Sequence, residues 1–127
     1  MRASVPTTVA AAMMAAGLAA CTTTSPEAGR ALFSTHCAGC HGADATGRDG
    51  APDLTLIAAR NDGVFPEAQV MSVIDGYTRR DQHGGLMPEF GALLEGRAVL
   101  WISPDGAEIP TPESLVALAA YLGSVQR

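Results

Sequence analysis

Cys37, Cys40 and His41 form a Cys-x-x-Cys-His motif. This spacing is typical of covalent haem attachment. Two cysteines at the end of a helix can each form a thioether to one of the two haem vinyl groups, and the histidine that follows directs its imidazole at the iron from the same side. The short residues between the cysteines, Ala38 and Gly39, leave room for the porphyrin edge. The motif therefore predicts one covalently bound haem c with its iron.

The same cysteine pair permits two other interpretations. Cys-x-x-Cys is also the motif of a redox dithiol, but that motif usually accompanies a βαβ pattern, which this sequence lacks. The pair could also be half of a zinc site, although no second pair follows it. The chain has three cysteines, so haem attachment leaves only Cys21 to be explained.

Residues 1–20 have the pattern of a bacterial lipoprotein signal peptide. Arg2 precedes an apolar stretch over residues 9–20, which is too short to cross a bilayer as a helix. Leu18-Ala19-Ala20-Cys21 resembles the lipobox, in which cleavage precedes the cysteine and its sulfur is lipidated. An ordinary secretory signal and a buried alanine-rich helix are the alternatives. We expect lipidation of Cys21, a polar tether over residues 21–25, and export to the periplasmic side of a bacterial membrane.

Residues 26–127 then form one domain of ordinary size. The whole chain carries 13 acidic residues against 8 basic ones, for a formal net charge of -5, which argues against a nucleic-acid partner. All the basic residues are arginines. No apolar run reaches the roughly 18 residues of a membrane-spanning helix, so we expect membrane attachment only through the lipid.

The second axial ligand of the iron decides between electron transfer and the binding of small molecules, because an open position admits ligands. The candidates after His41 are Met71, His83 and Met87. Met71 lies in a helical apolar stripe and is expected in the core, while His83 lies in a polar stretch and is expected in an exposed loop. Met87 follows two glycines and precedes Pro88, in a loop that can present a thioether to the haem. We therefore predict ligation by His41 and Met87.

Nearly all of the chain after residue 25 resembles a small class I c-type cytochrome, a monohaem electron carrier. Haem attachment together with Met-Pro is the specific part of this resemblance. The matching positions are Gly29, Phe33, Cys37, Cys40, His41, Gly42, Gly47, 51–54, 87–90 and 118–122. The resemblance implies a mainly α-helical fold around one haem. It also implies that the Pro52 carbonyl orients the His41 imidazole, and that Gly29 lets the first and last helices cross, with Phe33 and Tyr121 packing at the crossing.

Local signals agree with that fold class. Ser25-Pro26 and Thr111-Pro112 read as an N-cap followed by a first-turn proline, so helices are expected from each to about residue 35 and to the C-terminus. Further helices are expected over 66–77 and 54–60. A Pro-Asp-Gly turn between apolar residues predicts a small β-hairpin near 98–110. We expect Trp101, in its first strand, to pack against protein rather than haem.

These features predict a carrier of single electrons between two redox proteins, both expected at the membrane. The chain has no lysine, so it cannot dock on an acidic partner through a ring of lysines. We therefore expect a partner with a basic or mainly apolar docking face. Arg60, Arg79, Arg80 and Tyr77 are the candidates to bind the haem propionates. The alternatives are a peroxidase-like haem enzyme and a ligand sensor, each of which needs an open or labile distal site.

Overall fold

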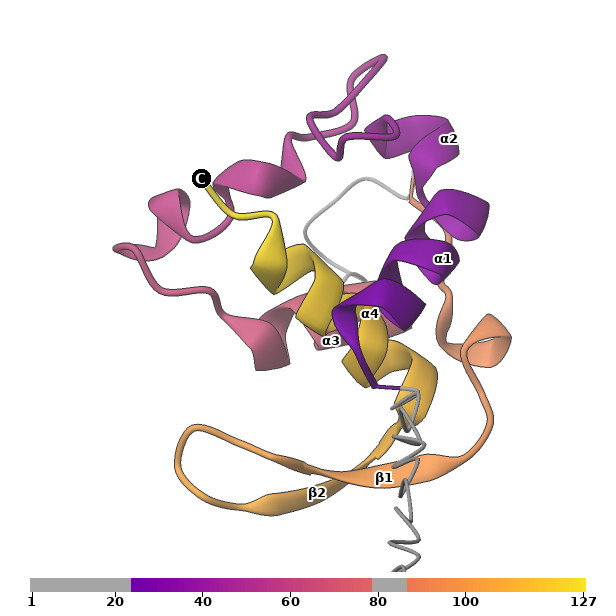
Figure 1. The fold of residues 1–127 in the computed structure, drawn as a ribbon, viewed down its shortest axis with the longest axis vertical. Coiled ribbons are helices and arrows are strands. Elements are labelled where there is room, and N and C mark those ends of the chain that lie inside the picture. The colour runs from indigo at the N-terminus through magenta and orange to yellow at the C-terminus, as the bar shows by residue number, and fades with distance from the viewer. Residues whose placement is uncertain (1–23, 79–86) are drawn as a thin grey trace, which may run out of the picture.

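Four α-helices, three single-turn 3-10 helices and a two-stranded sheet make up residues 24–78 and 87–127, which this computed structural model describes (Figure 1). Their order along the chain is α1 (Pro26–His36), α2 (Ala38–His41), η1 (Leu54–Leu56), η2 (Ala59–Asn61), α3 (Glu67–Asp75), η3 (Gly91–Leu93), β1 (Ala98–Ile102), β2 (Glu108–Pro112) and α4 (Glu113–Ser124). The expected fold class, mainly α with one small hairpin, is confirmed.

Helices α1 and α4 cross in direct backbone contact. A Cβ atom built on Gly29 would lie 1.9 Å from the carbonyl oxygen of Ala117, so only glycine permits this approach. One turn further along both helices, the rings of Phe33 and Tyr121 pack with their centroids 5.3 Å apart. Both features of the expected crossing are therefore present.

The start of α1 follows the predicted capping pattern. Ser25 has extended backbone angles, and its hydroxyl oxygen accepts a hydrogen bond from the Ala28 N–H at 3.3 Å. Pro26 occupies the first turn, where its missing N–H costs no hydrogen bond. The predicted N-cap is confirmed, and the helix extends one residue beyond the predicted end, to His36.

A single apolar core lies between the helices and the inner face of the hairpin. It includes Met71, which is 5% exposed, so the expected core position of this methionine is confirmed. Trp101 is 8% exposed and belongs to the same cluster, as expected of a packing residue. The other members come from all parts of the described chain: Phe33, Ala45, Val70, Ile74, Phe90, Leu94, Leu115, Leu118, Ala119, Tyr121 and Leu122.

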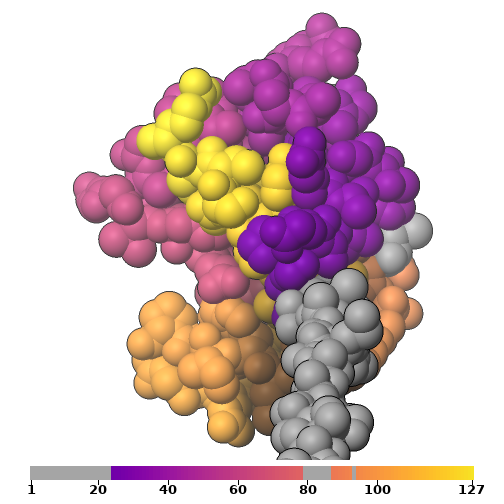
Figure 2. All heavy atoms as spheres, in the orientation of Figure 1, coloured from indigo at the N-terminus to yellow at the C-terminus, as the bar shows by residue number. Residues whose placement is uncertain are grey.

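The hairpin projects from one end of the molecule. Strands β1 and β2 pair antiparallel from Ala98 opposite Pro112 to Ile102 opposite Glu108. The hairpin lies at one end of the long axis and α2 lies near the other (Figure 1), and Figure 2 shows the hairpin as a lobe beside the helical body.

Three local predictions differ from the structure. Residues 54–60 do not form one helix, because two 3-10 turns, η1 and η2, take its place. Helix α3 is shorter than predicted, since Gly76 ends it in a left-handed conformation at φ +96°. Thr111 is not an N-cap. It belongs to β2, and its hydroxyl donates to the Ile109 carbonyl instead of accepting from the first turn of α4.

Candidate haem-binding site

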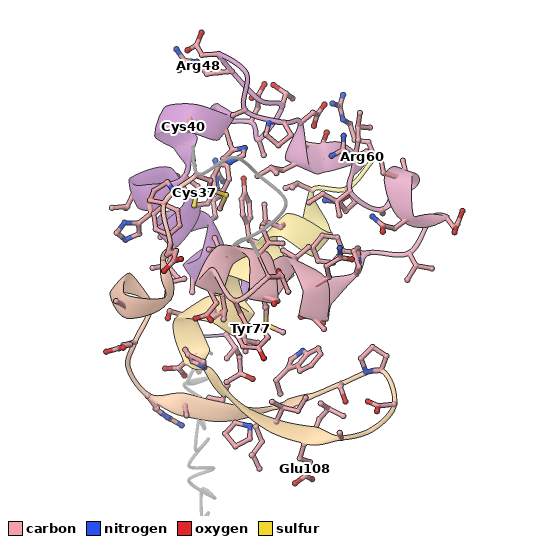
Figure 3. All side chains as sticks on the ribbon, turned by 180° about the vertical axis from the view of Figure 1, so that it is seen from behind. Cys37, Cys40, Arg48, Arg60, Tyr77 and Glu108 are labelled. Atoms are coloured by element: carbon pink, nitrogen blue, oxygen red, sulfur yellow. The ribbon has the colours of Figure 1, made fainter. Side chains whose placement is uncertain are left out.

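The haem-attachment motif lies on a single helical turn between α1 and α2. Cys37 ends α1 and precedes α2, and its carbonyl accepts hydrogen bonds from the N–H groups of Cys40 at 3.2 Å and His41 at 2.9 Å. Neither cysteine forms a disulfide, and Cys37 is half-buried whereas Cys40 is exposed. Figure 3 shows the two on adjoining parts of the chain, at the end of the molecule away from the hairpin. The helical turn thus presents two thiols and an imidazole as neighbours.

The Cys37 thiol has the electrostatics of a structural cysteine. Burial, with a smaller contribution from the neighbouring Cys40, raises the pKa of the Cys37 thiol to about 11. Redox-active Cys-x-x-Cys pairs have the opposite property, a lowered pKa that maintains a reactive thiolate. The half-buried Cys37 thiol is therefore a poor source of reactive thiolate.

The zinc interpretation finds no further ligands in the described ranges. Within residues 24–78 and 87–127, no group of three or more histidine, cysteine, aspartate and glutamate side chains is arranged to hold a metal ion. A structural zinc site needs four such ligands.

The His41 imidazole is buried and held in one orientation. Its side chain is 6% exposed, and Nδ1 lies 3.1 Å from the Pro52 carbonyl oxygen. A carbonyl only accepts, so Nδ1 carries the proton and donates, and Nε2 is left with its lone pair. Among the described residues Nε2 has no hydrogen-bond partner. A buried nitrogen without a partner is costly, and an iron bound to Nε2 would remove that cost.

A turn over residues 42–52 brings Pro52 to His41. The Gly47 N–H donates to the His41 carbonyl at 2.8 Å, and Gly47 has φ +88°. A Cβ atom on Gly47 would lie 2.5 Å from the Ala51 oxygen and 2.9 Å from the Pro52 carbonyl carbon. Glycine is therefore required here both for the backbone angle and for the close passage of the Pro52 peptide.

Asp53 fixes the far side of the Pro52 peptide. One carboxylate oxygen accepts from the Thr55 N–H at 2.8 Å and from its hydroxyl at 2.6 Å, while the other pairs with the Arg127 guanidinium at 3.1 Å. The Thr55 hydroxyl is the main cause that lowers the pKa of the Asp53 carboxyl, and Arg127 and Arg60 contribute less. The sequence placed Asp53 only among the positions that match class I cytochromes and assigned it no role, although Asp-x-Thr before a helical turn is a recognisable capping pattern.

Met87 lies on a segment that is hydrogen-bonded to the end of α3. Its side chain is half-buried and packs against the apolar core. Three residues further, the Phe90 N–H donates to the Ile74 carbonyl at 3.1 Å, and Phe90 is 8% exposed. The arrangement separates Met87 from Met71, which is enclosed in the core.

A family model described as "Cytochrome c" matches residues 26–126. The chain belongs to the cytochrome c family. Like other members, this cytochrome carries covalently bound haem c with iron and functions in electron transfer. The chemistry of the motif fits that cofactor, since it combines two cysteines that form no disulfide with a buried imidazole whose Nε2 has no partner in the described chain.

One relative of this cytochrome is the "Cbb3-type cytochrome c oxidase subunit CcoP" of Rubrivivax gelatinosus, which is 32% identical over 97 residues. The match covers 76% of this chain and 25% of that protein, so the cytochrome spans about a quarter of its relative's length. No solved structure matches the chain.

The remaining residues that the sequence suggested for the haem propionates, the iron and the lipid either lie apart from one another or fall outside the described residues. Arg60 is exposed, and its guanidinium donates to the Asp53 carbonyl. Tyr77 is 83% exposed and lies well apart from Arg60 in Figure 3. The other candidates, namely Cys21, Arg79, Arg80 and His83, lie outside the described residues. In the described part of this cytochrome no helix has the length and apolar character to span a membrane.

Proposed function

We propose that this cytochrome carries single electrons on one haem, attached through Cys37 and Cys40, with its iron between His41 and Met87. The observation that carries the proposal is the 3.1 Å contact between His41 Nδ1 and the Pro52 oxygen. It commits the buried imidazole to one tautomer and leaves Nε2 as the only nitrogen that can bind a metal. A ligand oriented in this way is also a stronger electron donor to iron.

The chain's own residues would set the properties of the site. The haem supplies one-electron chemistry through its Fe(III) and Fe(II) states. The Met87 thioether is a neutral ligand that favours the reduced state relative to a second imidazole. The apolar core beside Met87 acts in the same direction, because a low-dielectric surrounding disfavours additional positive charge. Cys37, Cys40, His41 and Met87 would hold the haem at four points, which would leave little to rearrange when its charge changes.

The decisive test compares two conservative substitutions. We expect Met87→Leu to abolish the weak far-red charge-transfer band of iron bound to methionine sulfur and to lower the reduction potential, because leucine has no ligand atom. Met71→Leu is the matched control, since Met71 is enclosed in the core, and we expect its spectrum and potential to stay close to those of the parent. Absorption spectra and potentiometric titrations of the purified holoproteins measure both.

Three results would reject the assignment. An unchanged spectrum in Met87→Leu excludes Met87 as a ligand. Loss of the band in Met71→Leu would transfer the role to that residue. High-spin iron that binds carbon monoxide readily in the reduced parent protein would favour the peroxidase-like enzyme or the sensor, because both require an accessible distal position.

We also propose that residues 1–20 are a lipoprotein signal peptide, that residues 21–25 are a tether behind a lipidated Cys21, and that residues 26–127 are the haem domain. The lipobox pattern and the short apolar segment support this organisation. Lipidation would hold the haem domain on the periplasmic side of a bacterial membrane. The mass of the mature protein tests it, because a Cys21→Ala variant must lose the lipid.

Redox partners in the same membrane fit a tethered carrier. The relative named as an oxidase subunit supports this proposal. The net charge of -5 and the complete lack of lysine favour a donor and an acceptor with basic or mainly apolar docking faces. Nucleic acid is not among the proposed partners, because binding to its phosphates requires a basic face.

A further inference from the structure

The outer face of the hairpin carries large apolar side chains in contact with solvent. Leu100 is 60% exposed and Ile102 is 55% exposed, and they are two residues apart on β1, so they share one face. Pro110, also exposed, lies opposite Leu100 on β2. We call Leu100, Ile102 and Pro110 the outer apolar face. Scattered apolar side chains are ordinary on protein surfaces, whereas adjacent ones on a projecting sheet indicate a contact.

The hairpin cannot turn this face inward, because Trp101 and Thr111 hold its opposite face on the core, although Ile109 on that face is 43% exposed. Trp101 is 8% exposed and Thr111 is 7% exposed, both on the inner side of the sheet. At the base of the hairpin the Glu113 N–H donates to the Arg97 carbonyl at 2.9 Å, which joins the start of α4 to the chain just before β1. The outer apolar face is thus a fixed part of the surface.

The chain that leads to Cys21 begins on the same side of the molecule as the hairpin. Gly29 contacts Ala117, and one turn further Phe33 contacts Tyr121, so α1 and α4 run in the same general sense through their crossing. The start of α1 therefore lies on the side where α4 begins, and α4 begins directly after β2. Figure 1 agrees, since the first described residues lie at the level just above β1.

We propose that the outer apolar face rests on the lipid bilayer that holds the diacylglyceryl group of Cys21, and this inference depends on the proposed lipidation. The segment from Cys21 to Ser25 reaches at most roughly 15–18 Å when fully extended. A bilayer at that distance from the start of α1 faces the hairpin end of the molecule. A second apolar contact adds to the binding of a lipid-anchored protein and restricts its orientation.

The contact is shallow. Glu108 lies opposite Ile102 and therefore on the same face of the sheet, and Figure 3 shows its side chain at the outer edge of the hairpin. A carboxylate is costly to bury without a partner, so it remains among the hydrated headgroups while Leu100 and Ile102 reach the boundary of the acyl chains. The outer face therefore lies on the bilayer without spanning it.

This orientation has a consequence for electron transfer. Cys40 and Glu108 lie at opposite ends of the molecule in Figure 3. With the hairpin on the lipid, the haem-attachment motif is directed away from the bilayer. A membrane-bound partner would then meet the motif through a domain that rises above the bilayer surface.

The test asks whether a spin label is surrounded by lipid or by water at each of two exposed positions, Ile102 and Val64. Mature, lipidated holoprotein carrying Ile102→Cys, or Val64→Cys as the matched control, is labelled with a nitroxide and reconstituted into vesicles of phosphatidylethanolamine and phosphatidylglycerol at 3:1. Val64 is 68% exposed and lies between η2 and α3, outside the hairpin. The haem spectrum reports folding of each variant. The readout is the collision rate of the label with oxygen, which concentrates in lipid, relative to that with a water-soluble nickel chelate.

We expect this ratio to rise several-fold at position 102 when the protein is bound to vesicles and to stay at its solution value at position 64. Equal, water-like ratios at both positions on a chain whose mass includes the lipid would overturn the hairpin contact and leave the anchor intact. A mature chain without lipid would overturn the anchor and this inference together. Protection of position 102 only in native membranes, and not in protein-free vesicles, would replace the bilayer by a protein partner and also overturn the inference.

Discussion

Gly47 and Gly50 have almost the same backbone conformation in very different surroundings. Their φ angles are +88° and +91°, but a Cβ atom on Gly47 would meet the backbone of Ala51 and Pro52, whereas one on Gly50 would meet nothing within 4 Å. The pair therefore separates two costs of adding a methyl group. One is the strain of a left-handed alanine, and the other is displacement of the Pro52 peptide from His41.

We expect Gly50→Ala to lower the free energy of unfolding by about 1–3 kcal/mol, which is the ordinary range for such strain. Gly47→Ala should cost more and should also change the reduction potential, because the Pro52 carbonyl can no longer orient the His41 imidazole. Urea titrations and potentiometry of the two holoproteins measure these effects. Equal losses of stability and equal potentials would show that the Pro52 contact is unimportant.

At the scale of elements, the crossing of α1 and α4 depends on Gly29. We expect Gly29→Ala to destabilise the fold by about 3 kcal/mol, the upper range for overpacking, because the added methyl group meets the rigid backbone of Ala117. Gly123→Ala in α4 is the control. Its Cβ atom would lie 3.3 Å from the Phe65 ring, which requires a small adjustment that the higher helix propensity of alanine offsets by about 1 kcal/mol.

Denaturant unfolding followed by far-ultraviolet circular dichroism checks this pair of variants. If Gly29→Ala and Gly123→Ala unfold at the same urea concentration, the two helices can separate without cost, and the close crossing does not stabilise the fold.

The connection between α3 and the Met87 segment is a second element-scale contact. A Cβ atom on Gly76 would lie 2.6 Å from the Glu89 side chain, while one on Gly63 would meet nothing within 4 Å, although both glycines have positive φ. We expect Gly76→Ala to displace residues 87–90 and to weaken the proposed bond between Met87 and iron. Added imidazole should then bind oxidised Gly76→Ala more tightly than it binds oxidised Gly63→Ala, which is the control. Identical imidazole titrations would mean that Met87 does not depend on this contact.

At the scale of the whole molecule, Asp53 joins the turn beside His41 to the C-terminal residue Arg127. The Thr55 hydroxyl, and to a lesser extent Arg127 and Arg60, keep the pKa of the Asp53 carboxyl below its ordinary value of 3.8. A group whose pKa is lower in the folded state stabilises that state fully above its unfolded pKa. This contribution disappears as the pH falls through the folded pKa.

We therefore expect the parent protein to be more stable than Asp53→Asn at pH 6 and the difference to shrink as the pH falls below about 4. Urea unfolding at a series of pH values measures the difference, and comparison with the variant cancels the other carboxylates. A difference that is constant across this range would show that the Asp53 charge does not contribute.

Much of this cytochrome follows from short-range patterns in its sequence. The haem motif, the capped start of α1, the core position of Met71 and the presence of a hairpin depend on residues within a turn or two of one another. Spacing alone determines them, because helical and strand periodicity place near neighbours on a common face.

Only the tertiary structure decides the remaining features, because each depends on residues brought together by packing. Asp53 and Arg127 are 74 residues apart in the sequence, and no local pattern encodes that contact. Thr111 has the sequence of an N-cap, yet pairing with β1 makes it part of a strand. Side chains of any strand point alternately to two faces, but β1 is apolar throughout, so the burial of Trp101 against the core determines that Leu100 and Ile102 face outward.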